Sequence, residues 1–151
     1  MHILTHVYYP AYNACVRSPN LLEKVQGRAT KVVRGLRNRP YEDRLRILGI
    51  PRLSKRRIRG DVIETFKIIK GFERVDKDTF FRMNVNSRTR GGDTKIYKER
   101  SRLDIRKNFF SQRAVDTWNR LPNEVRDAEN VPQLKRRLDK NWRRTQYGYT
   151  E

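Results

Sequence analysis

Apolar residues recur at helical spacing in the first quarter of the chain, with cations between them. The row consists of Leu22, Val25, Ala29, Val32 and Leu36. Side chains three and four residues apart share one face of an α-helix, so this pattern predicts an amphipathic helix with that row turned inward. Asn20 is suited to cap its start, and Pro40 forbids its continuation beyond Arg39.

Two further helices are predicted before residue 72. The first is short, with Leu45 and Leu48 inward and Gly49 as its C-terminal stop. The second begins at Ser54, whose side chain can cap it, and ends at Gly71. Its inward row is Ile58, Val62, Phe66 and Ile69, with Ile63 beside it.

The helical period is lost over residues 73–93, and residues 87–93 are rich in turn formers. This indicates an exposed connection between two lobes. Beyond it, apolar residues occupy odd-numbered positions (Tyr97, Leu103 and Ile105) and cations occupy even-numbered ones. Such alternation predicts one strand or a short β-hairpin with a cationic face.

Helical spacing returns near the C-terminus. The row Phe110, Ala114, Trp118 and Leu121 predicts a helix that stops at Pro122. A last helix is expected to begin near residues 130–132, because proline is tolerated in a first turn. Its inward residues are Leu134, Leu138 and Trp142.

The fold class predicted from these patterns is mainly α, with small helical lobes and a short β-hairpin between them. Residues 18–72 form one lobe, 73–93 the connection and 94–145 the second lobe. Residues 1–17 are interpreted as the remnant of an upstream segment and 146–151 as a tail.

Charge points to a polyanionic partner. The 151 residues include 36 Lys and Arg against 17 Asp and Glu, a net charge of +19, and only 36% are hydrophobic. The core should therefore be thin, and RNA or DNA phosphates are the commonest partner for such a balance. An anionic membrane is the weaker alternative, because the cations are spread over the whole chain and no run approaches the roughly 18 apolar residues of a spanning helix.

Three groups of cations are the candidate phosphate contacts. The first is Lys55, Arg56, Arg57 and Arg59, and the last is Lys135, Arg136, Arg137 and Lys140. Between them, Lys98, Arg100, Arg102 and Arg106 form the cationic face of the predicted strand. A solvated helix face is the competing interpretation, but it weakens when such clusters recur without compensating acids.

The sequence lacks the residues that catalysis and metal binding need. Polymerases hold two divalent ions about 3.5 to 4 Å apart on closely placed carboxylates. The adjacent acids Glu42 and Asp43 instead suit the start of a short helix. His2 and His6 have helical spacing, but further ligands are missing, so no metal, cofactor, catalytic residue or small-molecule substrate is expected.

A single cysteine, Cys15, excludes an internal disulfide and fits a reduced compartment. Together with an N-terminus that does not resemble a signal peptide, this predicts an intracellular protein, nuclear or cytoplasmic and not secreted.

Aromatic residues could stack on unpaired bases. Phe110, Trp118 and Trp142, however, lie on predicted inward rows, where core packing is the default. Phe109 could also stack. Tyr97, Tyr147 and Tyr149 are freer to be exposed, and Tyr97 is the better stacking candidate.

Several segments together resemble one known family. Residues 101–122 (SRLDIRKNFFSQRAVDTWNRLP) and 134–142 (LKRRLDKNW) are similar to the extreme C-terminal region of reverse transcriptases from non-LTR, LINE-type (jockey-like) retrotransposons. Upstream, residues 22–31, 40–45 and 57–67 look like the same family in the same order, so the resemblance covers roughly residues 8–142.

The resemblance implies a non-catalytic C-terminal fragment of an RNA-directed DNA polymerase that retains a basic nucleic-acid-binding surface. Residues 22–36 and 54–72 would correspond to a thumb-like helical part, and 102–142 to the terminal part. The family's aromatic-x-Asp-Asp turn, its upstream aspartate and its endonuclease domain have no counterpart here. The alternative is a small basic interaction or regulatory protein that binds an acidic protein, either domesticated or a non-functional remnant.

Overall fold

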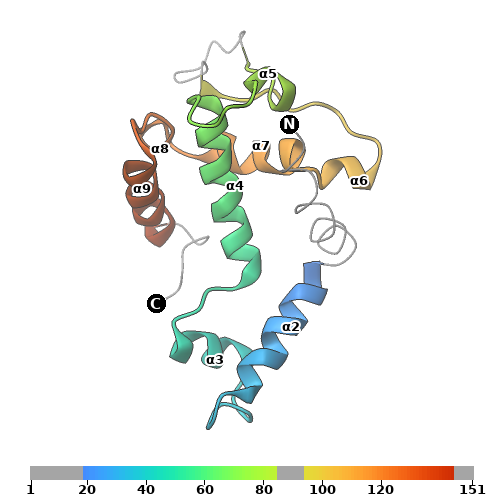
Figure 1. Cartoon of the computed structure of the whole chain (residues 1–151), viewed down its shortest axis with the longest axis vertical. Helices are drawn as coiled ribbons and strands as arrows, with labels where there is room; N and C mark the ends of the chain where they lie inside the picture. The colour runs from blue at the N-terminus through green and yellow to red at the C-terminus, as the bar shows by residue number, and fades with distance from the viewer. Residues whose placement is uncertain (1–18, 85–93, 145–151) are drawn as a thin grey trace. The chain divides into compact units, whose positions relative to one another are not determined.

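The computed structural model of the chain describes residues 19–84 and 94–144. The described part is helical, which confirms the predicted mainly α class (Figure 1). Its helices are α2 (Pro19–Val32), α3 (Tyr41–Leu48), α4 (Leu53–Ile69), α5 (Lys77–Phe80), α6 (Asp104–Lys107), α7 (Phe110–Arg120), α8 (Asn123–Arg126) and α9 (Val131–Arg144).

The chain divides into two compact units between Arg57 and Ile58, within α4. This division lies upstream of the 73–93 connection at which the sequence pattern changes. We refer to the described residues before it as the first unit and to those after it as the second unit, and each is described separately below.

In the first unit, α2 is tied to the segment around α3 by polar contacts. The Tyr41 hydroxyl donates a hydrogen bond of 3.0 Å to Glu23, and the Gln26 amide donates one of 3.3 Å to the carbonyl of Pro51. Leu36 and Leu45 are the buried apolar residues of this unit. Helix α2 ends at Val32, before the expected limit, and Asn20 lies within it instead of capping it.

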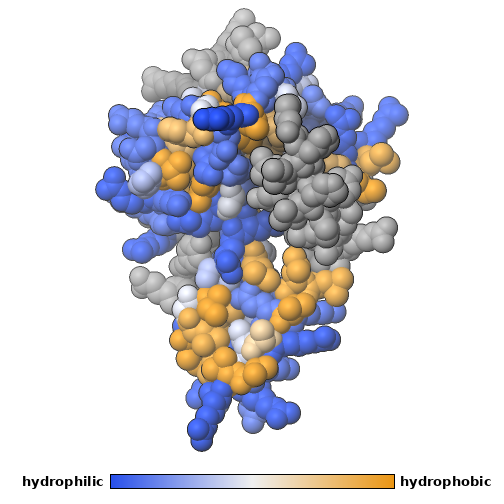
Figure 2. All heavy atoms as spheres, in the orientation of Figure 1, coloured by the Kyte–Doolittle hydropathy of each residue, from blue (hydrophilic) through white to orange (hydrophobic). Residues whose placement is uncertain are grey.

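The predicted inward row of α2 is wrong for most of its members. Val25 and Val32 are 60% and 86% exposed, and only Leu36, which lies beyond the helix end, is buried. Figure 2 shows apolar side chains gathered on the surface over the α2 and α3 part of the molecule. Periodicity therefore identified the helix, but the described residues provide no second layer to cover its apolar face.

Glycines end α3 and α4 as predicted. Gly49 and Gly71 have φ values of 64° and 73°, in the left-handed region that glycine enters at little cost. After α3, the Gly49 and Ile50 amides donate to Arg46 and Leu45, and the residues around Gly71 repeat this arrangement after α4. These paired hydrogen bonds satisfy carbonyls that the helix ends would otherwise leave unpaired.

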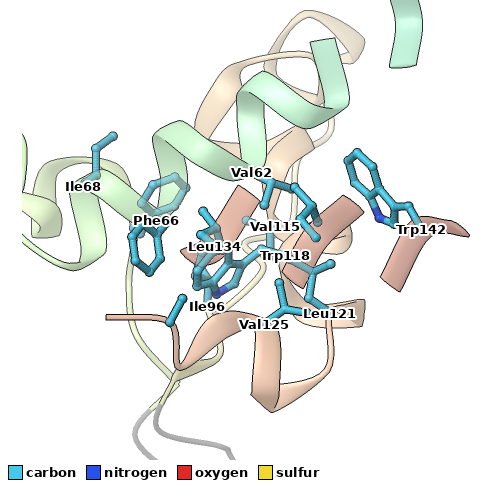
Figure 3. Packing of buried hydrophobic residues seen from close by; sticks show 13 residues of the cluster. Val62, Phe66, Ile68, Ile96, Val115, Trp118, Leu121, Val125, Leu134 and Trp142 are labelled. Carbon is cyan, nitrogen blue, oxygen red and sulfur yellow. The ribbon is translucent and has the colours of Figure 1, made fainter. Parts of the chain in front are cut away.

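The core of the second unit joins α4, α7, α8 and α9 (Figure 3). Its buried apolar residues are Val62, Phe66, Ile68, Phe81, Ile96, Val115, Trp118, Leu121, Val125, Ala128, Leu134, Leu138 and Trp142. The predicted rows of α7 and α9 are confirmed. Phe110 packs against this cluster from its edge.

Helix α4 departs from the predicted pattern at both ends of its row. Ile58 is 40% exposed, whereas Ile68, which was not on the predicted row, is buried. Ser54 lies inside the first turn and does not cap the helix, because α4 begins one residue earlier, at Leu53. The buried face is therefore centred further toward the C-terminal end of α4 than the periodicity indicated.

The strand or hairpin predicted from Tyr97 to Arg106 is wrong. Among the described residues, the extended segment makes one isolated antiparallel bridge, between Met83 and Ile96, and residues 104–107 form α6. Tyr97, Leu103 and Ile105 are exposed, and the single buried apolar side chain of this segment is Ile96. Alternation was misleading because the backbone pairing with residues 82–84 does not extend beyond this bridge, and a helix side chain binds the Ile96 backbone on the other side.

That helix side chain is the carboxamide of Asn119. It accepts a hydrogen bond of 2.9 Å from the Ile96 amide and donates one of 2.8 Å to the Ile96 carbonyl. The Trp118 indole donates to the Thr94 carbonyl at 2.8 Å. Helix α7 thus satisfies backbone groups that a neighbouring strand would otherwise bind.

Helix α5 lies within the predicted 73–93 connection and was not foreseen. The carboxylate of Asp76 caps it by accepting from the Asp78 amide at 3.0 Å. No described helix combines the length and apolar composition needed to cross a bilayer.

Candidate nucleic-acid interface

Several of the predicted phosphate contacts are already engaged with acids. Arg59 donates two hydrogen bonds of 3.1 Å to Asp139, which join α4 to α9. Lys98 pairs with Asp116, and Arg106 pairs with Glu99 at 3.1 Å. A cation held in such a pair must give up its partner before it can bind a phosphate, so these three cations are weaker candidates than the sequence indicated.

Two more candidates are also engaged. Arg137 donates to the backbone carbonyl of Glu124 at the start of α8. Lys55 has an interaction partner as well. Arg137 thus links α9 to the start of α8.

The outward face of α9 keeps its cations available. Lys135, Arg136 and Lys140 are exposed, as is Arg143, and none forms an ion pair with any described residue. Arg136, Lys140 and Arg143 follow each other at helical spacing, opposite the buried row of Leu134, Leu138 and Trp142. This ridge was correctly placed by the sequence pattern.

The remaining candidates are Arg56, Arg57, Arg100 and Arg102. Arg56, Arg100 and Arg102 are exposed and Arg57 is half-buried. None of the four has an ion-pair partner within residues 19–84 and 94–144. Arg100 and Arg102 lie in the extended segment before α6, not on the face of a strand.

The largest group of unpaired cations was missing from the candidate residues. It lies in the first unit, on residues 24–39, which we call the acid-free segment because it contains no Asp or Glu. Its cations are Lys24, Arg28, Lys31, Arg34, Arg37 and Arg39. All are exposed, and none forms an ion pair with a described residue.

Lys24, Arg28 and Lys31 lie on α2, and two consecutive turns after the helix present Arg34, Arg37 and Arg39. The Leu36 amide donates to the Val33 carbonyl and the Arg39 amide to the Leu36 carbonyl, both at 3.1 Å. Gly35 supplies the positive φ, 82°, that the first turn requires. Leu36 is buried and anchors the turns, so the flanking arginines remain at the surface.

The turns and the end of α2 enclose a hollow of about 540 Å³. It is lined by Arg28, Lys31, Val32, Val33, Arg34, Gly35 and Arg37. Four of these residues are cations and none is acidic, so the hollow should concentrate anions from solution. The acid-free run itself was the sequence signal that could have located this site.

A burial effect on pKa appears beside the acid-free segment. Burial and the hydrogen bond to Glu23 raise the pKa of Tyr41 to about 12. Tyrosine is already neutral at physiological pH at its ordinary pKa of 10.0, so the raised pKa has its effect only in alkaline solution.

Acidic residues elsewhere have structural partners. Glu42 and Asp43 lie in the first turn of α3, as predicted, and pair with Arg52 and Arg46. Within the described ranges, no group of three or more His, Cys, Asp or Glu side chains could hold a metal ion. His2, His6 and Cys15 lie outside the described residues.

The aromatic residues separate into core and surface groups. Trp118 and Trp142 are buried, which confirms their assignment to the core. Tyr97 and Phe109 are exposed, as a stacking role would require. Tyr147 and Tyr149 lie outside the described residues.

The described residues thus combine a cationic hollow in the first unit with a cationic α9 ridge in the second. Both offer point charges to phosphates, and neither carries a carboxylate cluster for two-metal chemistry. In comparisons with known proteins, no family model, curated protein or solved structure matched the chain.

Proposed function

We propose that the chain binds RNA or DNA through phosphates and has no catalytic activity of its own. The acid-free segment carries the proposal, because it presents exposed, unpaired cations around a hollow without a compensating acid. The outward ridge of α9 supplies a second group of contacts. Recognition of this kind depends on charge and is largely independent of base sequence.

We further propose that the chain derives from the C-terminal region of a non-LTR retrotransposon reverse transcriptase. Support comes from the resemblance of residues 101–122 and 134–142, together with the basic composition. In the parent polymerase such a region would help to hold template and product strands. A nuclear or cytoplasmic location fits this role.

Fluorescence anisotropy with a labelled oligonucleotide tests the binding proposal. If four to six phosphates are engaged, affinity should fall by roughly two orders of magnitude or more between about 50 and 200 mM salt. Replacing Arg34 and Arg37 with Gln should weaken binding and lower the salt slope by about one per lost phosphate contact.

The matched control replaces Arg46 and Arg52 with Gln. These two cations belong to the same unit, and replacing them removes the same amount of charge. Each, however, is paired with a carboxylate. The control should retain the salt slope of the unmodified chain. An equal effect of both variants would mean that net charge alone drives binding, and an affinity insensitive to salt would contradict phosphate recognition.

Primer extension on an RNA template tests the catalytic part of the proposal. With magnesium or manganese present, the purified chain should give no extension above a no-protein control, because the required carboxylates are missing from the sequence. Extension that persists after repurification would contradict the assignment as a non-catalytic fragment.

A further inference from the structure

A second hollow, of about 510 Å³, lies in the second unit beside α5, α6 and the start of α7. Four aromatic residues line it. Phe81 is buried, whereas Phe80, Tyr97 and Phe109 are 39%, 49% and 45% exposed. Its volume is within the range of about 300 to 1,000 Å³ that is usual for ligand sites. Exposed apolar side chains that gather around one hollow mark a candidate binding site.

Contacts with the core and with a cation hold two of these rings in place. Phe80 packs edge-on against Phe110, with ring centroids 6.5 Å apart, and Phe110 contacts Phe81 in the core in the same way at 5.6 Å. The Arg82 guanidinium lies 5.2 Å from the centroid of the Tyr97 ring, and the Tyr97 amide donates to the Arg82 carbonyl at 2.7 Å. A ligand would therefore meet rings that are already ordered, which reduces the entropy lost on binding.

The charged residues that line the hollow balance each other, Arg82 and Arg106 against Asp78 and Glu99, and an excess of positive charge lies in the sequence segment beside it. Residues 95–107 contain six Lys and Arg and two acids in the sequence. Arg100 and Arg102 are exposed and have no ion-pair partner in the described part of the chain. Thr79, Ser111 and Gln112 add hydrogen-bonding groups to the lining. An apolar ligand would leave these charges and polar groups unused.

We propose that this hollow receives unpaired bases of a single-stranded nucleic acid, while Arg100 and Arg102 contact the adjacent phosphates. Ordered aromatic rings beside a cationic segment are the combination that single-strand binding uses, since every base has a face that can stack. Paired bases in a duplex are stacked on each other and cannot enter. This inference rests on the proposed nucleic-acid binding and adds a preference for single strands.

The test compares three labelled probes of equal length by fluorescence anisotropy: a thymidine oligonucleotide, an abasic oligonucleotide and a duplex. The thymidine strand should bind about tenfold more tightly than the abasic strand, which has the same phosphates but cannot stack. Tyr97→Leu should remove most of this difference and leave the affinities for the abasic strand and the duplex unchanged. Tyr97→Phe, which keeps the ring, should behave like the unmodified chain.

Phe72→Leu is the matched control, because Phe72 is an exposed aromatic residue of the same unit that does not line the hollow. It should leave all three affinities unchanged. An equal loss of thymidine-strand affinity in Phe72→Leu and Tyr97→Leu would overturn the assignment of this site. So would a loss in Tyr97→Leu that extends equally to the duplex while the circular dichroism melt is unchanged, because the ring would then not distinguish unpaired from paired bases.

Failure of this inference can be distinguished from failure of the proposed function. If the thymidine strand, the abasic strand and the duplex bind equally and with steep salt dependence, phosphate binding stands and the base site is overturned. If none of them binds, both proposals are wrong. Binding of an acidic, leucine-containing peptide that Tyr97→Leu abolishes, without any effect on the oligonucleotides, would assign the hollow to a protein partner and also overturn the inference.

Discussion

Arg113 of α7 and Asp61 of α4 are joined by two hydrogen bonds, from Nε at 2.8 Å and from Nη2 at 2.7 Å. The third guanidinium nitrogen, Nη1, donates to the Asn108 carbonyl at 2.9 Å. The two side chains are only 22% and 13% exposed. This pair therefore orients α7 on α4 in an environment where solvent screening is weak.

Replacing Asp61 with Ala should lower the free energy of unfolding by about 3 kcal/mol, because it leaves a largely shielded guanidinium without its carboxylate. Asp139→Ala is the comparison, since it breaks the more exposed pair with Arg59 and should cost about 1 kcal/mol or less. Urea denaturation followed by circular dichroism measures both. Equal costs would show that shielding does not distinguish the two pairs.

Asn119→Ala should release the extended segment around Ile96. The substitution removes both hydrogen bonds to the Ile96 backbone and should cost about 1 to 3 kcal/mol. Hydrogen exchange at the Ile96 amide should accelerate more than exchange in α9. Asn130→Ala is the control, because Asn130 accepts from the Gln133 amide at the start of α9 and its loss should leave the Ile96 amide protected.

Trp118→Ala should destabilise the second unit by about 3 to 5 kcal/mol. The indole is buried in the core and also donates to the Thr94 carbonyl, so both packing and a hydrogen bond are lost. Tyr97→Ala, at an exposed position, should change the thermal melt far less. An unchanged melt for Trp118→Ala would contradict the assignment of this residue to the core.

Arg126→Met should stabilise the chain. Arg126 is buried, two of its guanidinium nitrogens have no hydrogen-bond partner in the structure, and burial lowers its pKa. The remaining nitrogen, Nη2, donates to the Asn123 side chain. Replacing Arg126 with an apolar side chain of similar length loses this one hydrogen bond but removes the larger desolvation cost, so a gain of about 1 kcal/mol is expected. A fall in the melting temperature would show that the interactions with Asn123 and Asp127 outweigh the cost of burial.

Alkaline pH should reveal the environment of Tyr41. Its pKa is raised from 10.0 to about 12, first by burial and then by Glu23. Because the folded state disfavours tyrosinate, this stabilisation is complete below about pH 10 and is lost as the pH rises toward 12. Unfolding measured across that range should show a steeper loss of stability for the unmodified chain than for Tyr41→Phe. Parallel curves would contradict the raised pKa.

Local signals predicted much of the fold. Gly49, Gly71 and Pro122 ended helices where expected, and the inward rows of α7 and α9 were correct because each packs one face against a shared core. The predicted inward row of α2 and the predicted strand at residues 97–106 were wrong. Whether an apolar face is covered, and whether Ile96 pairs with a side chain, depends on tertiary contacts, and the spacing of apolar residues carries no information about these contacts.

The candidate site was also predictable only in part, because the sequence does not show tertiary contacts. Sequence clusters identify cations but not their partners: Arg59 binds Asp139, 80 residues away, and Lys98 binds Asp116 on another element. The α9 ridge was found because its neighbours in sequence already define its outward face. The acid-free segment is visible in the sequence as a run without carboxylates, but its cations are spaced three or more residues apart for the most part and so form no dense cluster.

The core of the second unit closes only when the two ends of that unit meet. Val62 and Phe66 near its beginning are buried in the same cluster as Leu138 and Trp142 near its end. Contacts between residues so distant in sequence form slowly, because the intervening loop must be ordered first. During synthesis, α4 would therefore leave the ribosome with its apolar face uncovered until α9 follows, so the residues of α9 decide whether this unit folds or aggregates.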